Sequence, residues 1–455
     1  MAKINIIDLN RQGGIGANSH YIEIGQWKAV VDVGLHPKFT GYEALPNFKK
    51  IPDDTLNVIL VTHAHLDHLG ALPSLAQRHP DAKILMSSGT AMIAPRMLRN
   101  SVQVMKTQRA ELGISEYPLY TNYDIKQIEE RIIGVDFLRP HHIGIGEDGL
   151  EVEFYPSGHI PGAASIRMTH GGRTILVTGD IQFEHQYILD GAYTPKLQPD
   201  LLITETTRGD TERIELGTRD NIIKHLLGNI KRILDKGGSC LVPVFALGRM
   251  QEMLATIHIG LSEGKIPPCQ IFCSGLGMEI VNYFDLLSRQ FGYLRFDRSI
   301  VNDLNIRRPS RDIKPGTPPS ERGLYLLSSG MLIENTPSYN LAASIISDPN
   351  SGICFVGYCD PDTPGGQLKD LKTGDRFYFS AHNYDAEIRA DIQDHHLTGH
   401  ADRGELVLFA KQQAPKNILL THGDKEARDW FRKNLHPIVP EANIHNPLPG
   451  DILTL

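Results

Sequence analysis

The sequence predicts an α/β protein of two domains, and three observations support this. The chain has 455 residues, which is more than one hydrophobic core usually supports. Short apolar runs rich in β-branched residues recur along it, which is typical of buried strands. Segments with apolar residues at helical spacing lie between these runs. Such alternation of strands and helices is typical of the α/β class.

Five apolar runs predict the strands, and each ends in a polar residue. Runs of this length without polar interruption are typical of strands that are buried on both faces. Polar residues just beyond several strand ends converge on one rim of a sheet, where open sheets place their ligands. The five segments are Lys28–Asp32, Val58–His63, Thr174–Asp180, Leu201–Glu205 and Asn417–His422.

Three segments between these runs predict helices. Leu69–Arg78 follows a histidine-rich segment, and Arg249–Ile259 follows Gly248. Asn221–Lys236 has its apolar residues at helical spacing and ends at a glycine pair, a common helix terminator. Residues 300–322 are rich in Pro, Arg and Asp and predict a long irregular loop.

The N-terminal segment and the cysteines indicate the compartment. The chain shows no apolar run long enough to cross a bilayer, and its first residues lack the apolar core of a secretory signal. We therefore expect a cytoplasmic protein without membrane contact. Five cysteines are spread thinly along the chain, which argues against a disulfide framework and favours small buried side chains.

The formal net charge of −7 does not by itself favour a nucleic-acid partner. Net charge governs long-range attraction rather than what a local groove can hold. Residues 289–314 carry seven basic and three acidic side chains, so that a local basic surface is possible. Runs of this kind are more often solvated surface than a binding site.

The strongest chemical pattern is the segment His63-Ala-His65-Leu-Asp67-His68. Imidazole nitrogens and carboxylate oxygens are ligands that zinc accepts. His63 and His65 point the same way if the segment is extended, while Asp67 and His68 stand at the turn into the next helix. An ordinary surface loop has little structural reason to hold three histidines and an aspartate in six residues, so the segment predicts a metal site.

This segment resembles the HxHxDH signature of the metallo-β-lactamase superfamily. The rest of the family pattern is matched in order by one residue before this segment, Asp32, and by three residues after it, His159, Asp180 and His422. The resemblance implies two zinc ions. It assigns His63, His65 and His159 to one ion, Asp67, His68 and His422 to the other, Asp180 to a bridge between them, and Asp32 to orienting the ligands.

Further segments resemble the β-CASP group of nucleic-acid-cutting enzymes within this superfamily. They are Glu205 in Thr-Glu-Thr-Thr, Pro243–Glu252, Ser328–Met331 and Gly399–Asp402. The chain looks closest to the compact bacterial members related to the pre-mRNA 3′-end-processing endonuclease. The implied fold is a metallo-β-lactamase αββα sandwich, residues 1–207 and 374–455, with an inserted α/β β-CASP domain, residues 208–373. Single-stranded RNA would enter between the two domains.

The resemblance also implies how the phosphodiester bond is cut. His400 is the expected general acid for the leaving 3′ oxygen, and Glu205 orients its ring. With Asp67 and Asp32 at the metals, these residues form the expected catalytic set. The products would carry a 5′-phosphate, through endonucleolytic and possibly also 5′→3′ exonucleolytic cleavage.

Contacts to the substrate are expected from two short segments. Arg249 begins a predicted helix after Gly248, and Ser329 and Gly330 lie in a small-residue turn. Both segments could present N–H groups to a phosphate, but helix capping explains them equally well. The family also favours a homodimer.

Three alternatives remain. A DNA-directed nuclease of the same group would carry a small apolar residue where His422 stands. A small-molecule hydrolase of the superfamily would not need an inserted domain of about 165 residues. A non-catalytic scaffold subunit would lack some of the metal ligands, whereas this sequence has them all.

Overall fold

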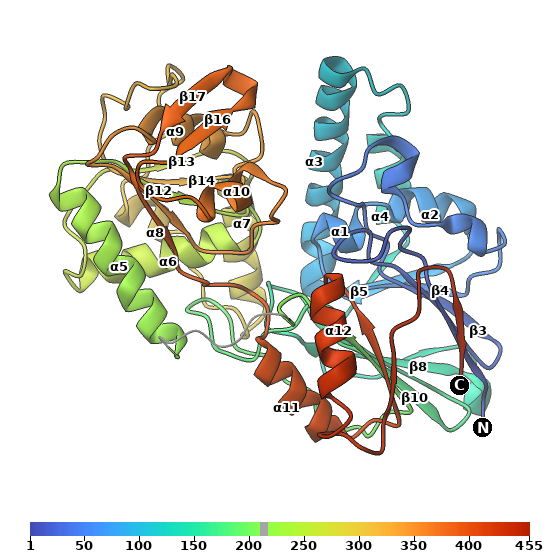
Figure 1. The fold of residues 1–455 in the computed structure, drawn as a ribbon. Coiled ribbons are helices and arrows are strands. Elements are labelled where there is room, and N and C mark those ends of the chain that lie inside the picture. The colour runs from blue at the N-terminus through green and yellow to red at the C-terminus, as the bar shows by residue number, and fades with distance from the viewer. Residues whose placement is uncertain (210–216) are drawn as a thin grey trace. The chain divides into compact units, whose positions relative to one another are not determined.

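The structure, a computed structural model, describes residues 1–209 and 217–455 and divides the chain into two compact units (Figure 1). Unit 1 comprises Met1–His185, Gly191–Arg213 and His400–Leu455, and unit 2 comprises Gln186–Asp190 and Ile214–Gly399. The domain range 208–373 expected from the sequence includes residues 210–216, which lie outside the described residues.

Unit 1 contains two seven-stranded mixed sheets. In spatial order the first is β21 (Ile452–Thr454), β1 (Ile4–Asp8), β2 (His20–Ile24), β3 (Trp27–Val31), β4 (Val58–Val61), β5 (Lys83–Ser87) and β6 (Ile132–Val135). The second is β20 (Asn443–His445), β19 (Asn417–Thr421), β11 (Leu201–Glu205), β10 (Arg173–Val177), β9 (Ala164–His170), β8 (Leu150–Pro156) and β7 (His141–Ile143).

The two sheets pack face to face around one hydrophobic core, and helices cover their outer faces (Figure 1). Four helices lie beside the first sheet: α1 (Leu66–Leu69), α2 (Leu72–Arg78), α3 (Ser88–Leu112) and α4 (Asn122–Glu129). Two cover the second sheet: α11 (Arg403–Gln413) and α12 (Lys425–Asn434). The predicted αββα sandwich is confirmed.

The strands of the second sheet are continuous apolar runs because both faces of this sheet are covered. Within β11, Leu201 and Ile203 face the core between the sheets, whereas Leu202 faces α11 and α12. In β19, Leu419 faces the inner core and its two neighbours face the helices. Because successive side chains alternate between faces, a strand that is covered on both sides needs apolar residues at every position.

Unit 2 is built on a parallel five-stranded sheet. Its order is β13 (Ile271–Cys273), β14 (Leu324–Leu327), β12 (Cys240–Pro243), β15 (Gly352–Phe355) and β18 (Asp391–Asp394), with a separate hairpin of β16 (Arg376–Phe379) and β17 (Tyr384–Glu387). The helices are α5 (Arg219–Asp235), α6 (Arg249–Ser262), α7 (Leu276–Gln290), α8 (Ile300–Asp303), α9 (Pro337–Ile345) and α10 (Pro364–Lys369).

Most predicted elements form within a few residues of the expected bounds. The helix expected at Leu69–Arg78 forms as α2 (Leu72–Arg78), and the separate short helix α1 (Leu66–Leu69) precedes it. The segment expected to be irregular begins with the short helix α8, and no further helix or strand longer than an isolated bridge follows it up to residue 322. All five cysteines are free, as expected.

Residues 374–399, which the sequence analysis placed with the first domain, pack within unit 2. Strand β18 pairs with β15 over four residue pairs, and Phe377 and Phe379 belong to the hydrophobic core of unit 2. The chain therefore enters unit 1 again at His400, after β18, the last strand of the unit 2 sheet.

The inner core of unit 1 gives a test of the sandwich. Phe154 in β8 is fully buried between the two sheets. We expect Phe154→Ala to lower the free energy of unfolding by about 3–5 kcal/mol, because it removes a buried ring and leaves a cavity. Urea denaturation measures the change, with Leu448→Ala, at a side chain that is 73% exposed, as the control. Equal stability of the two variants would contradict the packing described above.

Candidate metal centre

The candidate site lies where strands of both sheets in unit 1 end. Strands β10, β11 and β19 pair in parallel, so that their carboxyl ends lie at one edge of the second sheet. Asp180 and His422 follow the first and last of these strands, and Glu205 ends the middle one. In the first sheet β3 and β4 are also parallel, and Asp32 and the His63 segment follow them.

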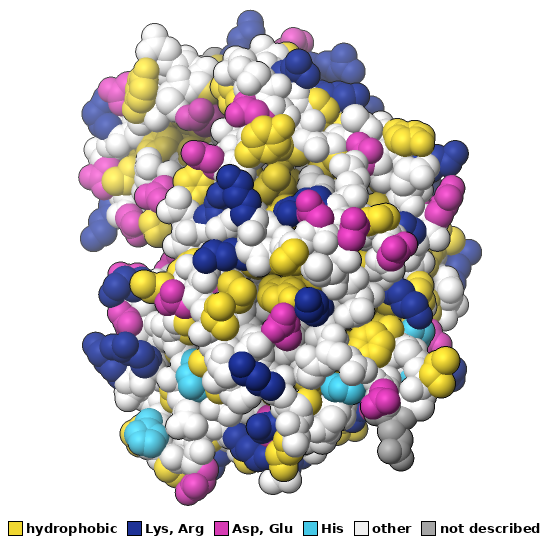
Figure 2. All heavy atoms as spheres, turned by 90° about the vertical axis from the view of Figure 1, so that its right-hand side faces the viewer, with side chains coloured by type: hydrophobic (Ala, Val, Ile, Leu, Met, Phe, Trp, Pro, Cys, Tyr) yellow, Lys and Arg dark blue, Asp and Glu magenta, His cyan; other side chains and the backbone are white. Residues whose placement is uncertain are grey.

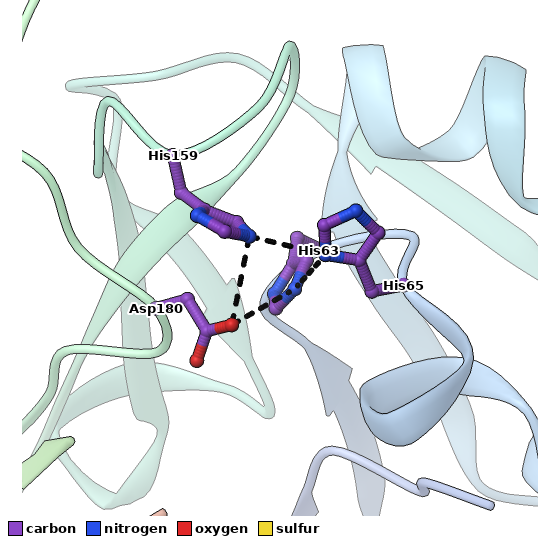
Figure 3. Close-up of side chains that lie close together, drawn as sticks. All are labelled: His63, His65, His159 and Asp180. Carbon is purple, nitrogen blue, oxygen red and sulfur yellow. Dashed lines mark hydrogen bonds and ion pairs between the residues drawn. The ribbon is translucent and has the colours of Figure 1, made fainter. Parts of the chain in front are cut away.

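Four of these side chains form a first donor cluster (Figure 3). The Nδ1 atom of His65 lies 3.2 Å from Nε2 of His63 and 3.0 Å from Nε2 of His159. Asp180 Oδ2 lies 3.5 Å from each of the two Nε2 atoms. Two ligands held 2.0–2.1 Å from a tetrahedral zinc ion are about 3.3 Å apart, so the spacing fits a metal at the centre of the cluster.

Three more side chains form a second cluster: Asp67, His68 and His422. His422 Nε2 lies 3.3 Å from His68 Nε2 and 3.4 Å from Asp67 Oδ2. The other carboxylate oxygen of Asp180, Oδ1, lies 3.3 Å from nitrogens of both His68 and His422. Asp180 therefore directs one oxygen to each cluster.

The hydrogen bonding of Asp180 supports a cation at this position. Its Oδ1 atom is buried and has no hydrogen-bond partner, although two imidazole nitrogens lie within 3.3 Å. A buried carboxylate oxygen without a partner is costly. A divalent ion shared with the two imidazoles would remove that cost.

The electrostatics of the clusters suit metal binding as well. Burial, together with His68, holds the pKa of His63 well below its ordinary value, so its nitrogen keeps a lone pair. Burial favours the neutral acid of Asp180, but His422 and His68 outweigh it and hold the pKa well below its ordinary value. Burial also opposes a charge on His68, yet the nearby carboxylates raise its pKa, so a cation would have to displace a proton there.

Asp32 bonds His68 on the side of the ring away from the cluster, a position from which a carboxylate can orient a metal ligand. Its Oδ2 atom lies 2.7 Å from His68 Nδ1, which leaves Nε2 of that ring facing the cluster. The backbone N–H and the hydroxyl of Thr62 donate to the same carboxylate at 2.7 Å and 2.8–2.9 Å. Asn18 Nδ2 donates to Asp32 at 3.2 Å.

His400 and Glu205 form a pair beside the clusters. His400 Nδ1 lies 2.9 Å from Glu205 Oε2, and its Nε2 atom lies 3.9 Å from Asp180. Burial lowers the pKa of His400, but the charges of Glu205 and Asp180 outweigh it, and the net pKa is raised. Although a Glu205 oxygen also lies within reach of Asp180 and His422, its oxygens bond His400 and the N–H of Ile181, at 2.6 Å.

The three residues expected to contact substrate all lie in unit 2. Arg249 is the first residue of α6 and is 8% exposed. Ser329 accepts a hydrogen bond from the Ile333 N–H at 2.9 Å through its hydroxyl. Gly330 packs against the Phe245 ring, which would lie 2.9 Å from an added Cβ.

Sequence reasoning missed three residues that position the donors. Asn18 bonds both Asp32 and His68 Nδ1, and the hydroxyl of Thr207 lies 3.0 Å from His422 Nδ1. Gly158, next to His159, has a positive φ and no room for a side chain. Thr207 could have been noticed in Thr-Glu-Thr-Thr, but no local pattern marks Asn18.

Comparison with known families agrees with this geometry. Residues 13–216 match the metallo-beta-lactamase superfamily, residues 250–368 match the Beta-Casp domain, and residues 385–446 match a "Zn-dependent metallo-hydrolase RNA specificity domain". The chain belongs to the β-CASP group of the metallo-β-lactamase superfamily. This membership places it among metal-dependent hydrolases.

Three relatives are similar in sequence to this chain over nearly all of its length. Integrator complex subunit 11 of Gallus gallus is 23% identical over all of this chain and 74% of its own length. Endoribonuclease YSH1 of Yarrowia lipolytica is 29% identical over 90% of this chain and 49% of its own. Cleavage and polyadenylation specificity factor 73 of Drosophila melanogaster is 26% identical over 90% and 58%. The chain thus spans about half to three quarters of the length of these relatives.

A solved structure supports the fold alone. The crystal structure of a protein of unknown function from Enterococcus faecalis V583 has a TM-score of 0.56 and 15% sequence identity, with full coverage of both chains.

The turn before His159 gives a test of how the site is held. A Cβ on Gly158 would lie 2.2 Å from the Gln182 carbonyl oxygen, at φ +73°, whereas Gly172 has the same φ and nothing within 4 Å. An alanine at positive φ costs about 1–2 kcal/mol, so we expect Gly172→Ala to lose that much stability. Gly158→Ala should lose clearly more, measured by urea denaturation, because backbone must also move. Equal losses would contradict the tight approach.

Proposed function

We propose that the chain is a zinc-dependent ribonuclease that hydrolyses phosphodiester bonds of single-stranded RNA and leaves a 5′-phosphate. The observation that carries this proposal is the convergence of seven donor side chains in two clusters that share Asp180, beside the His400–Glu205 pair. The match to an RNA specificity domain and the relatives named as endoribonucleases support RNA as the substrate.

Two zinc ions fit the two clusters. His63, His65 and His159 would hold one ion, and Asp67, His68 and His422 the other, with an oxygen of Asp180 directed to each. When bound, the ions would supply Lewis acidity and make water a competent nucleophile near neutral pH. Asp32 and Thr62 would keep the ring of His68 in the tautomer that binds metal.

His400 is suited to deliver a proton to the leaving 3′ oxygen. The charges of Glu205 and Asp180 raise the pKa of His400, which favours the protonated ring, and Glu205 bonds Nδ1 so that Nε2 faces the clusters. A general acid whose pKa lies near the working pH combines a large protonated fraction with ready proton release. Glu205 in turn is held by the Ile181 N–H.

The three alternative functions explain fewer of these observations than a ribonuclease does. A scaffold subunit has no need of a complete donor set, and here all seven donors converge. A small-molecule hydrolase does not explain the Beta-Casp and RNA specificity matches over residues 250–368 and 385–446. A DNA-directed nuclease is the remaining competitor, and the choice between RNA and DNA is made by the second experiment below.

Two further expectations remain predictions. None of the helices in residues 1–209 and 217–455 has the length and apolarity that crossing a bilayer requires. The cytoplasmic location and the homodimer that the sequence led us to expect are still predictions.

The first experiment measures metal content. We expect the purified chain to carry close to two zinc ions after dialysis, as measured by plasma mass spectrometry. Asp180→Ala should carry less than one, because both clusters lose a shared oxygen. Asp53→Ala, which removes an exposed carboxylate that is bonded to Arg78, serves as the control and should keep its metal. Full zinc content of Asp180→Ala would remove Asp180 from the ligand set.

The second experiment measures cleavage of end-labelled single-stranded RNA and DNA. We expect the chain to cut RNA in preference to DNA. His400→Ala should keep its zinc and cut RNA at least about a hundredfold more slowly, the usual scale for loss of a general acid.

His142→Ala, at an exposed histidine of the same unit, is the matched control and should cleave at the normal rate. Preference for DNA would favour the competing nuclease, and absence of cleavage of either strand by the zinc-loaded chain would defeat the proposal.

A further inference from the structure

Unit 2 buries two arginines at the starts of two neighbouring helices. Arg219 is the first residue of α5 and Arg249 the first residue of α6, and the two helices pack on each other. Their exposed fractions are 7% and 8%. Arginine is seldom buried to this degree unless it is paired.

This position is unfavourable for a cation in three ways. The N-terminus of a helix carries a partial positive charge, which repels an arginine placed there. Burial removes the guanidinium groups from water. The two arginines also repel each other, and burial together with Arg219 lowers the pKa of Arg249 to about 9.

One carboxylate faces the pair, and it already has other partners. Glu252 is fully buried and accepts hydrogen bonds from the Tyr187 and Ile188 N–H groups at 2.9 Å and 3.1 Å. One of its oxygens lies 3.4 Å from Arg219 Nη2. Two guanidinium groups thus share one carboxylate, and the buried group keeps a net positive charge.

Both arginines retain N–H donors that are buried without a partner. Among the described residues, Arg249 Nη1 and Arg219 Nε have no hydrogen-bond acceptor. Arg219 uses its other nitrogens on the Thr398 carbonyl at 3.2 Å and on Gln186 at 3.5 Å. Other arginines of this unit are paired: Arg232 with Asp391, Arg295 with Asp190 and Arg322 with Asp348.

We propose that Arg219 and Arg249, at the starts of α5 and α6 respectively, form a binding site for a phosphate group of the RNA backbone. An anion there would meet two guanidinium groups and the positive ends of two helices, the groups that proteins use to bind phosphate. It would also supply the missing negative charge. The RNA identity of the ligand rests on the proposed function, whereas the affinity for phosphate does not.

The first arm measures affinity for RNA. A labelled single-stranded RNA 12-mer is titrated by fluorescence anisotropy against the full zinc-loaded chain in a His400→Ala background, from about 0.05 to 0.2 M KCl. We expect Arg249→Met to bind about tenfold more weakly and to reduce the slope of log K against log salt by about 0.7, the loss of one phosphate contact on a single strand.

Two variants make this arm specific. Arg249→Lys keeps the charge and loses the planar fork, so it should bind more weakly than the parent with an unchanged salt slope. Arg322→Met removes an arginine of the same unit that is already bonded to Asp348 and should leave both quantities unchanged. An unchanged affinity and slope for Arg249→Met would overturn the proposal.

The second arm measures thermal unfolding. Inorganic phosphate, compared with chloride at equal ionic strength, should raise the midpoint temperature of the parent and of Arg322→Met more than that of Arg249→Met. In phosphate-free buffer Arg249→Met should unfold at or above the parent midpoint, because an unpaired buried charge has been removed. A variant that unfolds well below the parent, or fails to fold, would show that the guanidinium is structural and would overturn the proposal.

The two proposals fail in different ways. RNA cleavage with an unchanged salt slope in Arg249→Met would defeat the phosphate site alone. A phosphate response that depends on Arg249, in a chain that cuts no RNA, would defeat the ribonuclease and the RNA identity of the ligand but leave the anion site.

Discussion

The parallel pairing of β10, β11 and β19 is the constraint on which the candidate centre depends. Parallel strands bring their carboxyl ends to one edge, so Asp180, Glu205 and His422 meet although the chain between the first and last is more than 200 residues long. The core between the two sheets then brings the His63 segment opposite this edge. Removing any of these strands would separate donors that no local structure holds together.

Once the donors have been brought together, their charges have to be stabilised, and hydrogen bonds behind the donors do this. Asp32 bonds the ring of His68 from the side away from the cluster, and Glu205 does the same for His400. Each such bond sets the tautomer and the ring direction. A buried ion pair stabilises little by itself, so these networks are better explained by the chemistry of the centre than by stability.

The two units solve the problem of buried charge differently. At the candidate centre of unit 1 carboxylates and imidazoles face each other, and one buried carboxylate oxygen without a hydrogen-bond partner, Asp180 Oδ1, lies near two imidazoles. In unit 2 Arg219 and Arg249 share one carboxylate and keep unused donors. The unpaired carboxylate oxygen in unit 1 favours binding of a cation, and the unpaired guanidinium donors in unit 2 favour binding of an anion. On the face drawn in Figure 2, basic and acidic side chains are interspersed, so on that face local groups rather than a broad field of one sign would have to attract a nucleic acid.

The sequence by itself determined the residue types and their local setting: strands covered on both faces, a polar residue at each strand end, and the donor-rich segment from His63 to His68. These are properties of neighbouring residues, which a linear pattern records. Only the tertiary structure decided which strands pair, and with it the roles of Asn18 and Gly158, the packing of residues 374–399 in unit 2, and the meeting of Arg219 with Arg249. Such contacts depend on sheet order and helix packing, which are non-local and leave no period in the chain.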